Sequence, residues 1–119
     1  MRLILISDTH GDHDHIIVPD GDVLIHAGDL TNNGEISEVR DFNRWLGTMP
    51  HTHKLVITGN HDFCLADASP SAQELLSNAI YLQDQTVVIE GIRFYGSPWQ
   101  PSFCNMAFNL SSDAQLQEK

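Results

Sequence analysis

Three short apolar segments of this chain each run directly into a group of polar side chains. The segments begin at Leu3, Val23 and Leu55, and they end in Ser-Asp-Thr-His, His-Ala-Gly-Asp and Gly-Asn-His-Asp, respectively. Their aliphatic and β-branched residues favour strands. In open α/β sheets, ligands bind beyond the carboxyl ends of parallel strands. The pattern therefore predicts three parallel strands whose ends share one site.

The segment between the second and third strands predicts a helix. Asn32-Asn33-Gly34-Glu35 has the form of a capping box, with Asn32 as the cap and Glu35 reaching back. Apolar residues then recur at helical spacings of three, three and four, at Ile36, Val39, Phe42 and Leu46, with Trp45 beside them. Gly47 is expected to end this helix. A strand, a helix and a strand in this order predict a right-handed crossover and a parallel pair.

The pattern changes after the third strand. A short helix is expected from a box at Ser71 and Glu74, with Leu75, Leu76 and Ala79 turned inward, followed by a short strand over residues 80–82. Residues 86–90 and 92–95 flank Gly91 and predict two strands joined by a tight turn. We therefore expect an antiparallel hairpin after the parallel βαβ core.

Length, charge and cysteine spacing limit the classes of function. The chain has 119 residues, which is the length of one domain, and a formal net charge of −10, which disfavours stable binding to nucleic acids. The apolar run that starts at Leu3 is too short for a signal peptide or a membrane span. Cys64 and Cys104 lack the spacing of a metal or redox pair. These features predict a cytoplasmic protein with reduced thiols and no membrane partner.

The first two strand ends carry residues that suit a metal. Asp8 and His10 are two residues apart, which places both side chains on one side of an extended backbone. Asp29 follows Gly28, and a glycine at this point lets a carboxylate approach a metal without crowding by a neighbouring Cβ. A polar turn after a buried strand would explain either cluster taken alone.

The remaining histidines have simpler interpretations. His13 and His15 lie in an acidic stretch that is typical of a solvated loop, although His13 is also a candidate to line the pocket and contact substrate. His26 is expected to be a hydrogen-bonded core residue rather than a ligand. His51 and His53 precede the third strand, at the opposite end of the sheet from the site, and are expected on the surface.

The motifs Asp8-x-His10, Gly28-Asp29 and Gly59-Asn60-His61-Asp62, each after an apolar strand and in this order, resemble the signature of the calcineurin-like metallophosphoesterases. The stretches Ile-Ser-Asp-Thr-His, Leu-Ile-His-Ala-Gly-Asp, Tyr-Leu-Gln-Asp and Tyr-Gly-Ser-Pro-Trp resemble its small metallophosphoesterase-domain branch, which includes cyclic-nucleotide phosphodiesterases. The resemblance covers about residues 3 to 110. It implies an α/β fold, the N-terminal part of a four-layer α-β-β-α sandwich.

The resemblance also implies a metal-dependent hydrolase of phosphate esters. Asp8 and His10 would bind the first of two divalent ions, Asp29 would bridge both, and Asn60 would bind the second. Mn²⁺ is the expected metal, with Fe and Zn²⁺ as alternatives. A hydroxide activated by both ions would attack phosphorus, while His61 acts as general acid or stabilises phosphoryl charge. The implied substrate is a small phosphodiester or phosphomonoester, and a cyclic nucleotide is one candidate.

The family pattern continues beyond the motifs found here. Its Thr-His-x-Pro-Pro and Gly-His-x-His motifs have no counterpart among residues 1–119, so the chain resembles a C-terminally truncated domain. Four ligands are too few for two metals. Two hypotheses remain open: a phosphoesterase, or a non-catalytic interaction or scaffold module on the same fold. Half a sandwich would expose the hairpin edge from Ile92 to Tyr95, which predicts self-association there.

Overall fold

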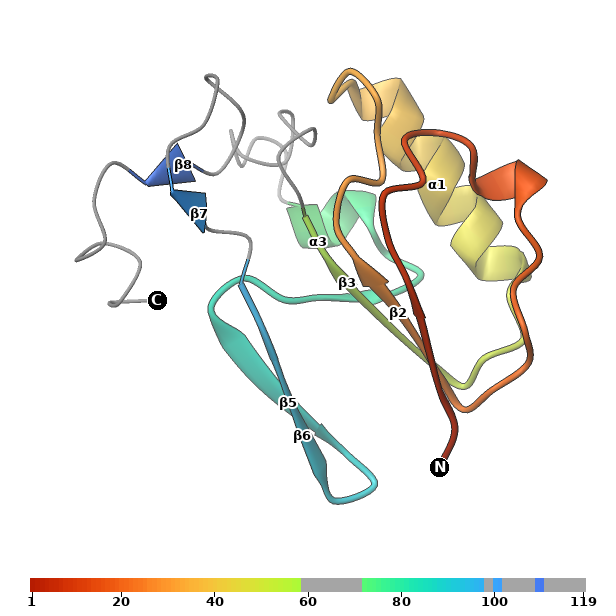
Figure 1. Ribbon diagram of the computed structural model, residues 1–119, viewed down its shortest axis with the longest axis vertical. Helices are drawn as coiled ribbons and strands as arrows, with labels where there is room; N and C mark the ends of the chain where they lie inside the picture. The colour runs from red at the N-terminus through yellow and green to blue at the C-terminus, as the bar shows by residue number, and fades with distance from the viewer. Residues whose placement is uncertain (59–71, 98–99, 102–108, 111–119) are drawn as a thin grey trace.

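A computed structural model describes residues 1–58, 72–97, 100–101 and 109–110 of the chain (Figure 1). Its main sheet has four parallel strands in the order β1-β2-β3-β4, with bounds Leu3–Ile6, Val23–Ala27, His53–Ile57 and Ile80–Tyr81. The 3-10 turn η1, His13–His15, lies between β1 and β2, helix α1, Ile36–Thr48, joins β2 to β3, and the short helix α3, Ala72–Leu75, precedes β4. The expected parallel βαβ core is confirmed.

Two smaller sheets follow the parallel core. Strands β5, Gln85–Ile89, and β6, Ile92–Gly96, form an antiparallel hairpin around Gly91. Strands β7, Gln100–Pro101, and β8, Asn109–Leu110, form a short parallel pair. The predicted hairpin is confirmed, so the chain has the mixed α/β architecture expected from its sequence.

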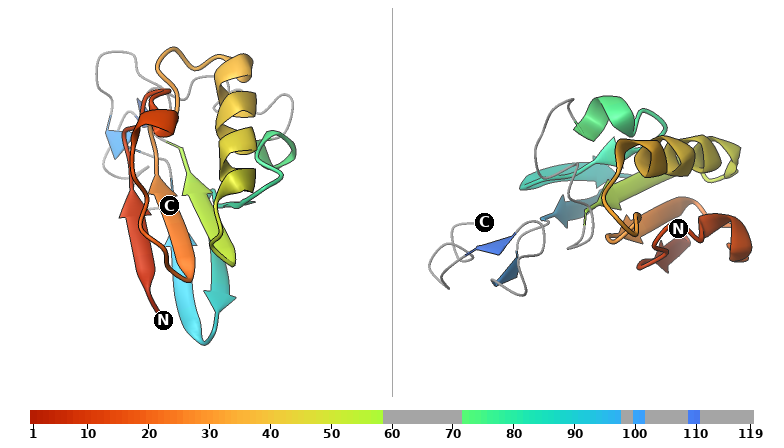
Figure 2. Two further views of the ribbon diagram at one scale, coloured as in Figure 1. Left: turned by 90° about the vertical axis from the view of Figure 1, so that its right-hand side faces the viewer. Right: turned by 90° about the horizontal axis from the view of Figure 1, so that it is seen from above.

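Alternate residues of the central strands point to opposite faces of the main sheet. Leu24 and Val56 face α1, which covers one face (Figure 2). Val23 and Leu55 face the other way and pack with Ile89 of the hairpin. The predicted helical stripe is confirmed, because Val39, Phe42 and Leu46 are buried, as is Trp45 beside them, and Ile36 is partly buried against the same core. Burying a large apolar side chain stabilises a fold by about 1.5–3 kcal/mol, so this stripe fixes α1 on the sheet.

The ends of α1 differ from the sequence-based expectation. Glu35, not Asn32, is the N-cap residue, and the helix runs past Gly47 to Thr48. The cap lies later in the chain because the capping box forms between Glu35 and Glu38, in which each side chain accepts the backbone N–H of the other residue. Gly47 serves close packing instead of termination, since a Cβ there would lie 2.8 Å from the Asn78 side-chain nitrogen.

The two histidines near the start of β3 also differ from expectation. His51 is only 4% exposed, and its Nε2 lies 2.9 Å from the carbonyl oxygen of Pro19, so the prediction of a surface residue is wrong. His53 is the first residue of β3 and is half-buried. Both lie at the amino end of β3, where the loop before β2 folds against them. The prediction that they lie away from the carboxyl ends of the strands is confirmed.

The described part of the chain contains no helix that is both long and apolar enough to cross a bilayer. Leu75, the last residue of α3, and Leu76 directly after it are buried as expected. Cys64, Cys104 and Ser71 lie outside the described residues.

Candidate metal centre

Three predicted ligands lie together at the carboxyl ends of β1 and β2. One ligand atom from each of Asp8, His10 and Asp29 lies within 4.8 Å of the others. This convergence follows from the register, in which Ile6 of β1 pairs with His26 of β2 and the two strands end side by side. The predicted convergence of these three side chains is confirmed, and their binding of a metal stays a prediction.

The third strand leads to the same edge of the sheet. Ile57 at the end of β3 pairs with Ala27 at the end of β2. The next described residue, Thr58, is buried, and its hydroxyl oxygen lies 3.4 Å from the hydroxyl oxygen of Tyr81. Asn60 and His61 lie outside the described residues, so their predicted roles as ligand and as catalytic residue stay predictions.

All three converging residues have a backbone conformation that L residues rarely adopt. Their φ angles are +55° for Asp8, +45° for His10 and +57° for Asp29. Asp and His tolerate this left-handed region better than most residues do, yet it still costs about 1–2 kcal/mol per residue. Such strain persists where surrounding contacts determine it, and it concentrates at functional sites.

Backbone hydrogen bonds between the two loops hold these strained residues in place. The N–H of Asp8 donates to the carbonyl of Gly28 at 2.9 Å, and the N–H of His10 donates to the carbonyl of Asp29 at 3.0 Å. The N–H of Gly11 donates to Leu30 at 3.0 Å. The loops after β1 and β2 therefore form one continuous hydrogen-bonded unit.

The imidazole of His10 is oriented by a backbone carbonyl. Its Nδ1 lies 3.2 Å from the carbonyl oxygen of Thr31, which can only accept, so Nδ1 carries the proton. In the neutral ring Nε2 is then the nitrogen with the lone pair, and it lies 3.7 Å from Oδ1 of Asp8. A histidine that donates one ring N–H to a carbonyl and offers the other nitrogen is the usual arrangement at metal sites.

The charge of Asp8 is favoured by its surroundings. A hydrogen bond from the Ser7 side chain lowers the pKa of the Asp8 carboxyl, burial opposes this effect, and a hydrogen bond with the Asp29 side chain lowers the pKa further. Asp8 therefore carries its negative charge at neutral pH, as a metal ligand must.

His26 lies beneath the site as a neutral core residue. It is 1% exposed, and the N–H of Gly28 donates to its Nδ1 at 3.2 Å. The proton is therefore on Nε2, which donates to the hydroxyl oxygen of Thr9 at 3.0 Å. Burial lowers the pKa of His26 to about 4, an effect that the charge of Asp8 opposes. The expectation of a hydrogen-bonded core residue is confirmed.

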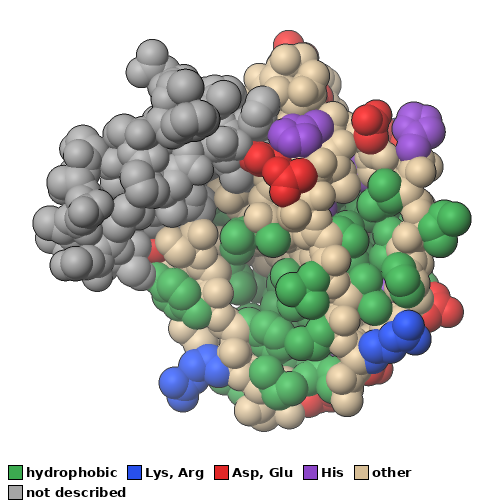
Figure 3. Space-filling model, viewed as in Figure 1, with side chains coloured by type: hydrophobic (Ala, Val, Ile, Leu, Met, Phe, Trp, Pro, Cys, Tyr) green, Lys and Arg blue, Asp and Glu red, His purple; other side chains and the backbone are tan. Residues whose placement is uncertain are grey.

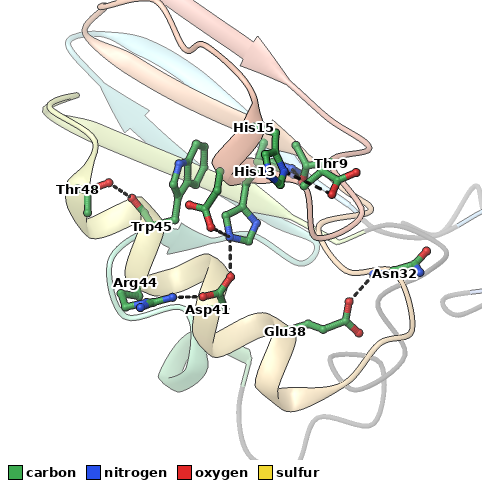
Figure 4. Close-up of polar contacts among 12 residues, drawn as sticks. Thr9, His13, His15, Asn32, Glu38, Asp41, Arg44, Trp45 and Thr48 are labelled. Atoms are coloured by element: carbon green, nitrogen blue, oxygen red, sulfur yellow. Dashed lines mark hydrogen bonds and ion pairs between the residues drawn. The ribbon is translucent and has the colours of Figure 1, made fainter.

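His13 anchors the first loop to α1 (Figure 4). It is 1% exposed, its Nε2 lies 2.9 Å from Oδ2 of Asp41, and its ring lies 5.4 Å from that of Phe42 and 5.3 Å from that of Trp45. The interpretation of this stretch as a solvated loop is therefore wrong for His13, because α1 covers it. The buried position gives no support to substrate contact.

A second group of possible ligand atoms surrounds this anchor. His13, Asp14 and Asp41 offer atoms within 4.8 Å of one another. The Arg44 guanidinium, however, already pairs with Asp41, and its hydrogen bond lowers the pKa of that carboxyl. Because the Arg44 guanidinium already pairs with the Asp41 carboxylate, we assign this group a structural role.

Sequence reasoning missed Glu38. Its carboxylate accepts hydrogen bonds from the backbone N–H groups of Asn32 at 2.7 Å, Asn33 at 3.0 Å and Glu35 at 3.2 Å. Burial acts to raise the pKa of the Glu38 carboxyl, but the three hydrogen bonds outweigh burial. The net effect is a lowered pKa. A carboxylate in the first turn of an amphipathic helix, just after a polar loop, is the only sequence signal that indicates this role.

Known proteins are similar to this chain along nearly its whole length. Metallophosphoesterase domain-containing protein 1 of Homo sapiens is 45% identical over 141 aligned residues, which cover 99% of this chain and 43% of the human protein. UPF0046 protein T07D4.2 of Caenorhabditis elegans is 39% identical over 149 residues, covering 100% of this chain and 38% of the worm protein. The chain thus spans less than half the length of these relatives.

The family itself is matched over almost the entire sequence. Residues 1–110 match the family described as calcineurin-like phosphoesterase, which includes both strand-end motifs whose side chains converge in the structure. The predicted resemblance is confirmed, and this chain belongs to the calcineurin-like phosphoesterase family of metal-dependent enzymes.

Proposed function

We propose that this chain carries the N-terminal part of a two-metal phosphoesterase site that hydrolyses a small phosphodiester or phosphomonoester. The observation that carries the proposal is the convergence of Asp8, His10 and Asp29 at one edge of the sheet. A non-catalytic scaffold would need none of these side chains, and none of the strained backbone that presents them. The formal charge of −10 favours a small substrate over a polyanion.

The donor set fits divalent metals. Two carboxylates and one imidazole suit Mn²⁺, Fe or Zn²⁺, and Mn²⁺ is the metal that we propose. Asp8 and His10 would hold one ion, Asp29 would lie between two ions, and Asn60 would hold the other. When bound, such a pair neutralises phosphoryl oxygens and lowers the pKa of a water toward neutrality.

Residues of this chain would orient a metal ligand and donate a proton or a hydrogen bond to the substrate. In the neutral His10 ring, Nε2 keeps its lone pair because Nδ1–H donates a hydrogen bond to the carbonyl oxygen of Thr31. His61, which directly follows Asn60, would donate a proton to the leaving oxygen or a hydrogen bond to a phosphoryl oxygen. The remaining ligands would come from residues that the longer relatives carry, since this chain corresponds to only 43% of the human protein.

Hydrolysis of a chromogenic phosphodiester by a protein that joins this chain to the further residues carried by its relatives, called the extended protein below, tests the proposal. We expect turnover with added Mn²⁺ and none with EDTA. His61→Ala should retain metal binding and lower kcat by on the order of 10²-fold. His15→Ala is the matched control, since that side chain is 81% exposed and lies outside the ligand cluster. Turnover in EDTA would contradict the two-metal site, and an unchanged kcat in His61→Ala would contradict the role of His61.

A further inference from the structure

We infer that Glu38 is a positioning residue for the metal centre, acting on His10 through a single peptide group. The inference rests on the proposed metal-dependent function. Glu38 is not one of the candidate metal ligands Asp8, His10 and Asp29. It holds the backbone that fixes the orientation of the His10 ring.

The link between the two side chains is the peptide group that joins Thr31 to Asn32. Its carbonyl oxygen, that of Thr31, lies 3.2 Å from Nδ1 of His10. Its N–H, that of Asn32, donates to Oε2 of Glu38 at 2.7 Å (Figure 4). A peptide group is planar, so fixing its N–H also fixes the direction of its carbonyl. A hydrogen bond from the N–H to a carboxylate also makes the carbonyl a stronger acceptor, because bonds in a chain polarise one another.

Glu38 is well placed to hold this peptide rigidly. It lies in the first turn of α1, and the next residue, Val39, is 0% exposed in the core. Its other oxygen accepts from Asn33 at 3.0 Å and Glu35 at 3.2 Å, so the carboxylate cannot turn away without losing several bonds. These charge-assisted bonds are roughly twice as strong as neutral ones. A packed helix thereby fixes a loop that has no regular structure of its own.

The same loop carries the bridging ligand. Asp29 lies two residues before Thr31, and the Asp29 carbonyl accepts the backbone N–H of His10 at 3.0 Å. Thr31 is 0% exposed, and its hydroxyl accepts the N–H of Gly34 at 3.0 Å. Releasing the Thr31–Asn32 peptide would therefore loosen His10 directly and Asp29 through the shared loop.

Glu38→Gln tests this inference with little change in side-chain volume. The amide has one accepting oxygen and no charge, so it cannot hold all three N–H groups. Loss of a group that orients a metal-binding histidine lowers metal affinity by about 10- to 100-fold, and we expect about tenfold here because one peptide intervenes. Glu35→Gln is the matched control, since it makes the same change at the same helix end but leaves the Asn32 N–H bonded to Glu38.

Two readouts on the extended protein separate positioning from a general loss of stability. Mn²⁺ affinity is measured from the EPR signal of free Mn²⁺, and the visible spectrum of the Co²⁺-loaded protein reports ligand geometry. We expect Glu38→Gln to bind Mn²⁺ about tenfold more weakly with an altered Co²⁺ spectrum, and Glu35→Gln to match the wild type on both.

The outcomes distinguish the two proposals. If the wild type binds Mn²⁺ and Glu38→Gln has the same affinity and the same Co²⁺ spectrum, the positioning role is overturned and the metal centre stands. If the wild type binds no divalent metal, the proposed function fails and the inference falls with it.

A measurement on the wild type avoids any dependence on the folding of a variant. Coupling between sites is reciprocal, so a loop that helps to bind metal must be stabilised by metal. Adding diamagnetic Zn²⁺ should therefore slow hydrogen exchange of the Asn32 and Asn33 amides several-fold, while the Gly91 amide in the hairpin turn is unchanged. Equal exchange of Asn32 and Asn33 with and without Zn²⁺ would overturn the inference.

Discussion

At the residue scale, Asp29 combines a candidate ligand with a strained backbone. Its φ of +57° is a conformation in which a Cβ is unfavourable and glycine is not. Asp29→Gly and Asp29→Ala both remove the carboxylate, so the difference between them reports the strain at this φ, reduced by the greater entropy of glycine in the unfolded chain. We expect the glycine variant to be more stable than the alanine variant by about 1 kcal/mol in urea unfolding with EDTA present.

Arg40 provides the control for this comparison. It is exposed within α1, where alanine is favoured over glycine by about 1 kcal/mol, so the order of the two variants should reverse. If Asp29→Ala is as stable as Asp29→Gly while the Arg40 pair behaves as expected, position 29 is unstrained in solution.

His26 makes stability depend on pH. Burial lowers its pKa from the ordinary 6.5 to about 4, so between these values the unfolded chain binds a proton that the folded chain does not. The contribution of His26 is therefore complete above pH 6.5 and declines as the pH falls toward 4, by about 3 kcal/mol in all.

Urea unfolding at a series of pH values checks this dependence. His26→Gln should flatten the curve between pH 4 and 6.5 relative to the wild type, because the titrating group is gone. His15→Gln, at a position 81% exposed, should keep the wild-type slope. A His26→Gln variant that loses stability as steeply as the wild type would show that other groups cause the effect.

At the scale of elements, α1 both covers the sheet and holds the two loops that form the site. Its buried stripe fixes the helix on β2 and β3. Two polar residues of the helix also hold the loops. Asp41 bonds to His13 of the loop after β1, and Glu38 bonds to Asn32 of the loop after β2. The packing of α1 on the sheet therefore also helps to position the candidate metal ligands on these loops.

The hairpin is held to the main sheet by a close approach at Gly96. A Cβ at this position of β6 would lie 2.4 Å from Cβ of Leu82 and 2.7 Å from Cγ2 of Ile57. Gly96→Ala would push the hairpin off β3, and we expect a loss of about 1–3 kcal/mol in the free energy of unfolding. Urea unfolding measures this loss.

Gly91 is the natural comparison for Gly96. No heavy atom would lie within 4 Å of a Cβ at Gly91, although its φ of +81° disfavours L residues. Gly91→Ala should therefore show only the conformational penalty of about 1 kcal/mol. A Gly96→Ala variant no less stable than Gly91→Ala would mean that the hairpin does not pack closely on β3.

At the scale of the whole molecule, one face presents apolar side chains to solvent, below the acidic and histidine side chains (Figure 3). Exposed fractions reach 67% for Leu5 on β1, 61% for Val88 on β5 and 53% for Tyr95 on β6. At about 25 cal/mol per Å², covering even a few hundred Å² would contribute several kcal/mol. The relatives carry further residues, since the human protein is matched over 43% of its length.

We predict that the 119-residue chain associates with itself through the hairpin. Pairing along β6 would cover apolar side chains and satisfy edge backbone groups together. Sedimentation velocity should show an average mass that rises with concentration, and Ile92→Lys should suppress the rise. Ile17→Lys replaces a residue that is 97% exposed but lies outside the hairpin, so this variant should show the same rise in mass as the wild type. A monomer at all concentrations would contradict this prediction.

The sequence by itself determined the elements and the convergence of three candidate ligands. Helical and strand periodicity are local properties, and the order of apolar runs and polar endings brought Asp8, His10 and Asp29 to one edge through parallel pairing. Tertiary structure alone decided the burial of His13 and His51 and the reach of Glu38 to the Thr31–Asn32 peptide. Those features depend on contacts between segments that fold against one another, such as His13 with Asp41, and no local periodicity encodes such contacts.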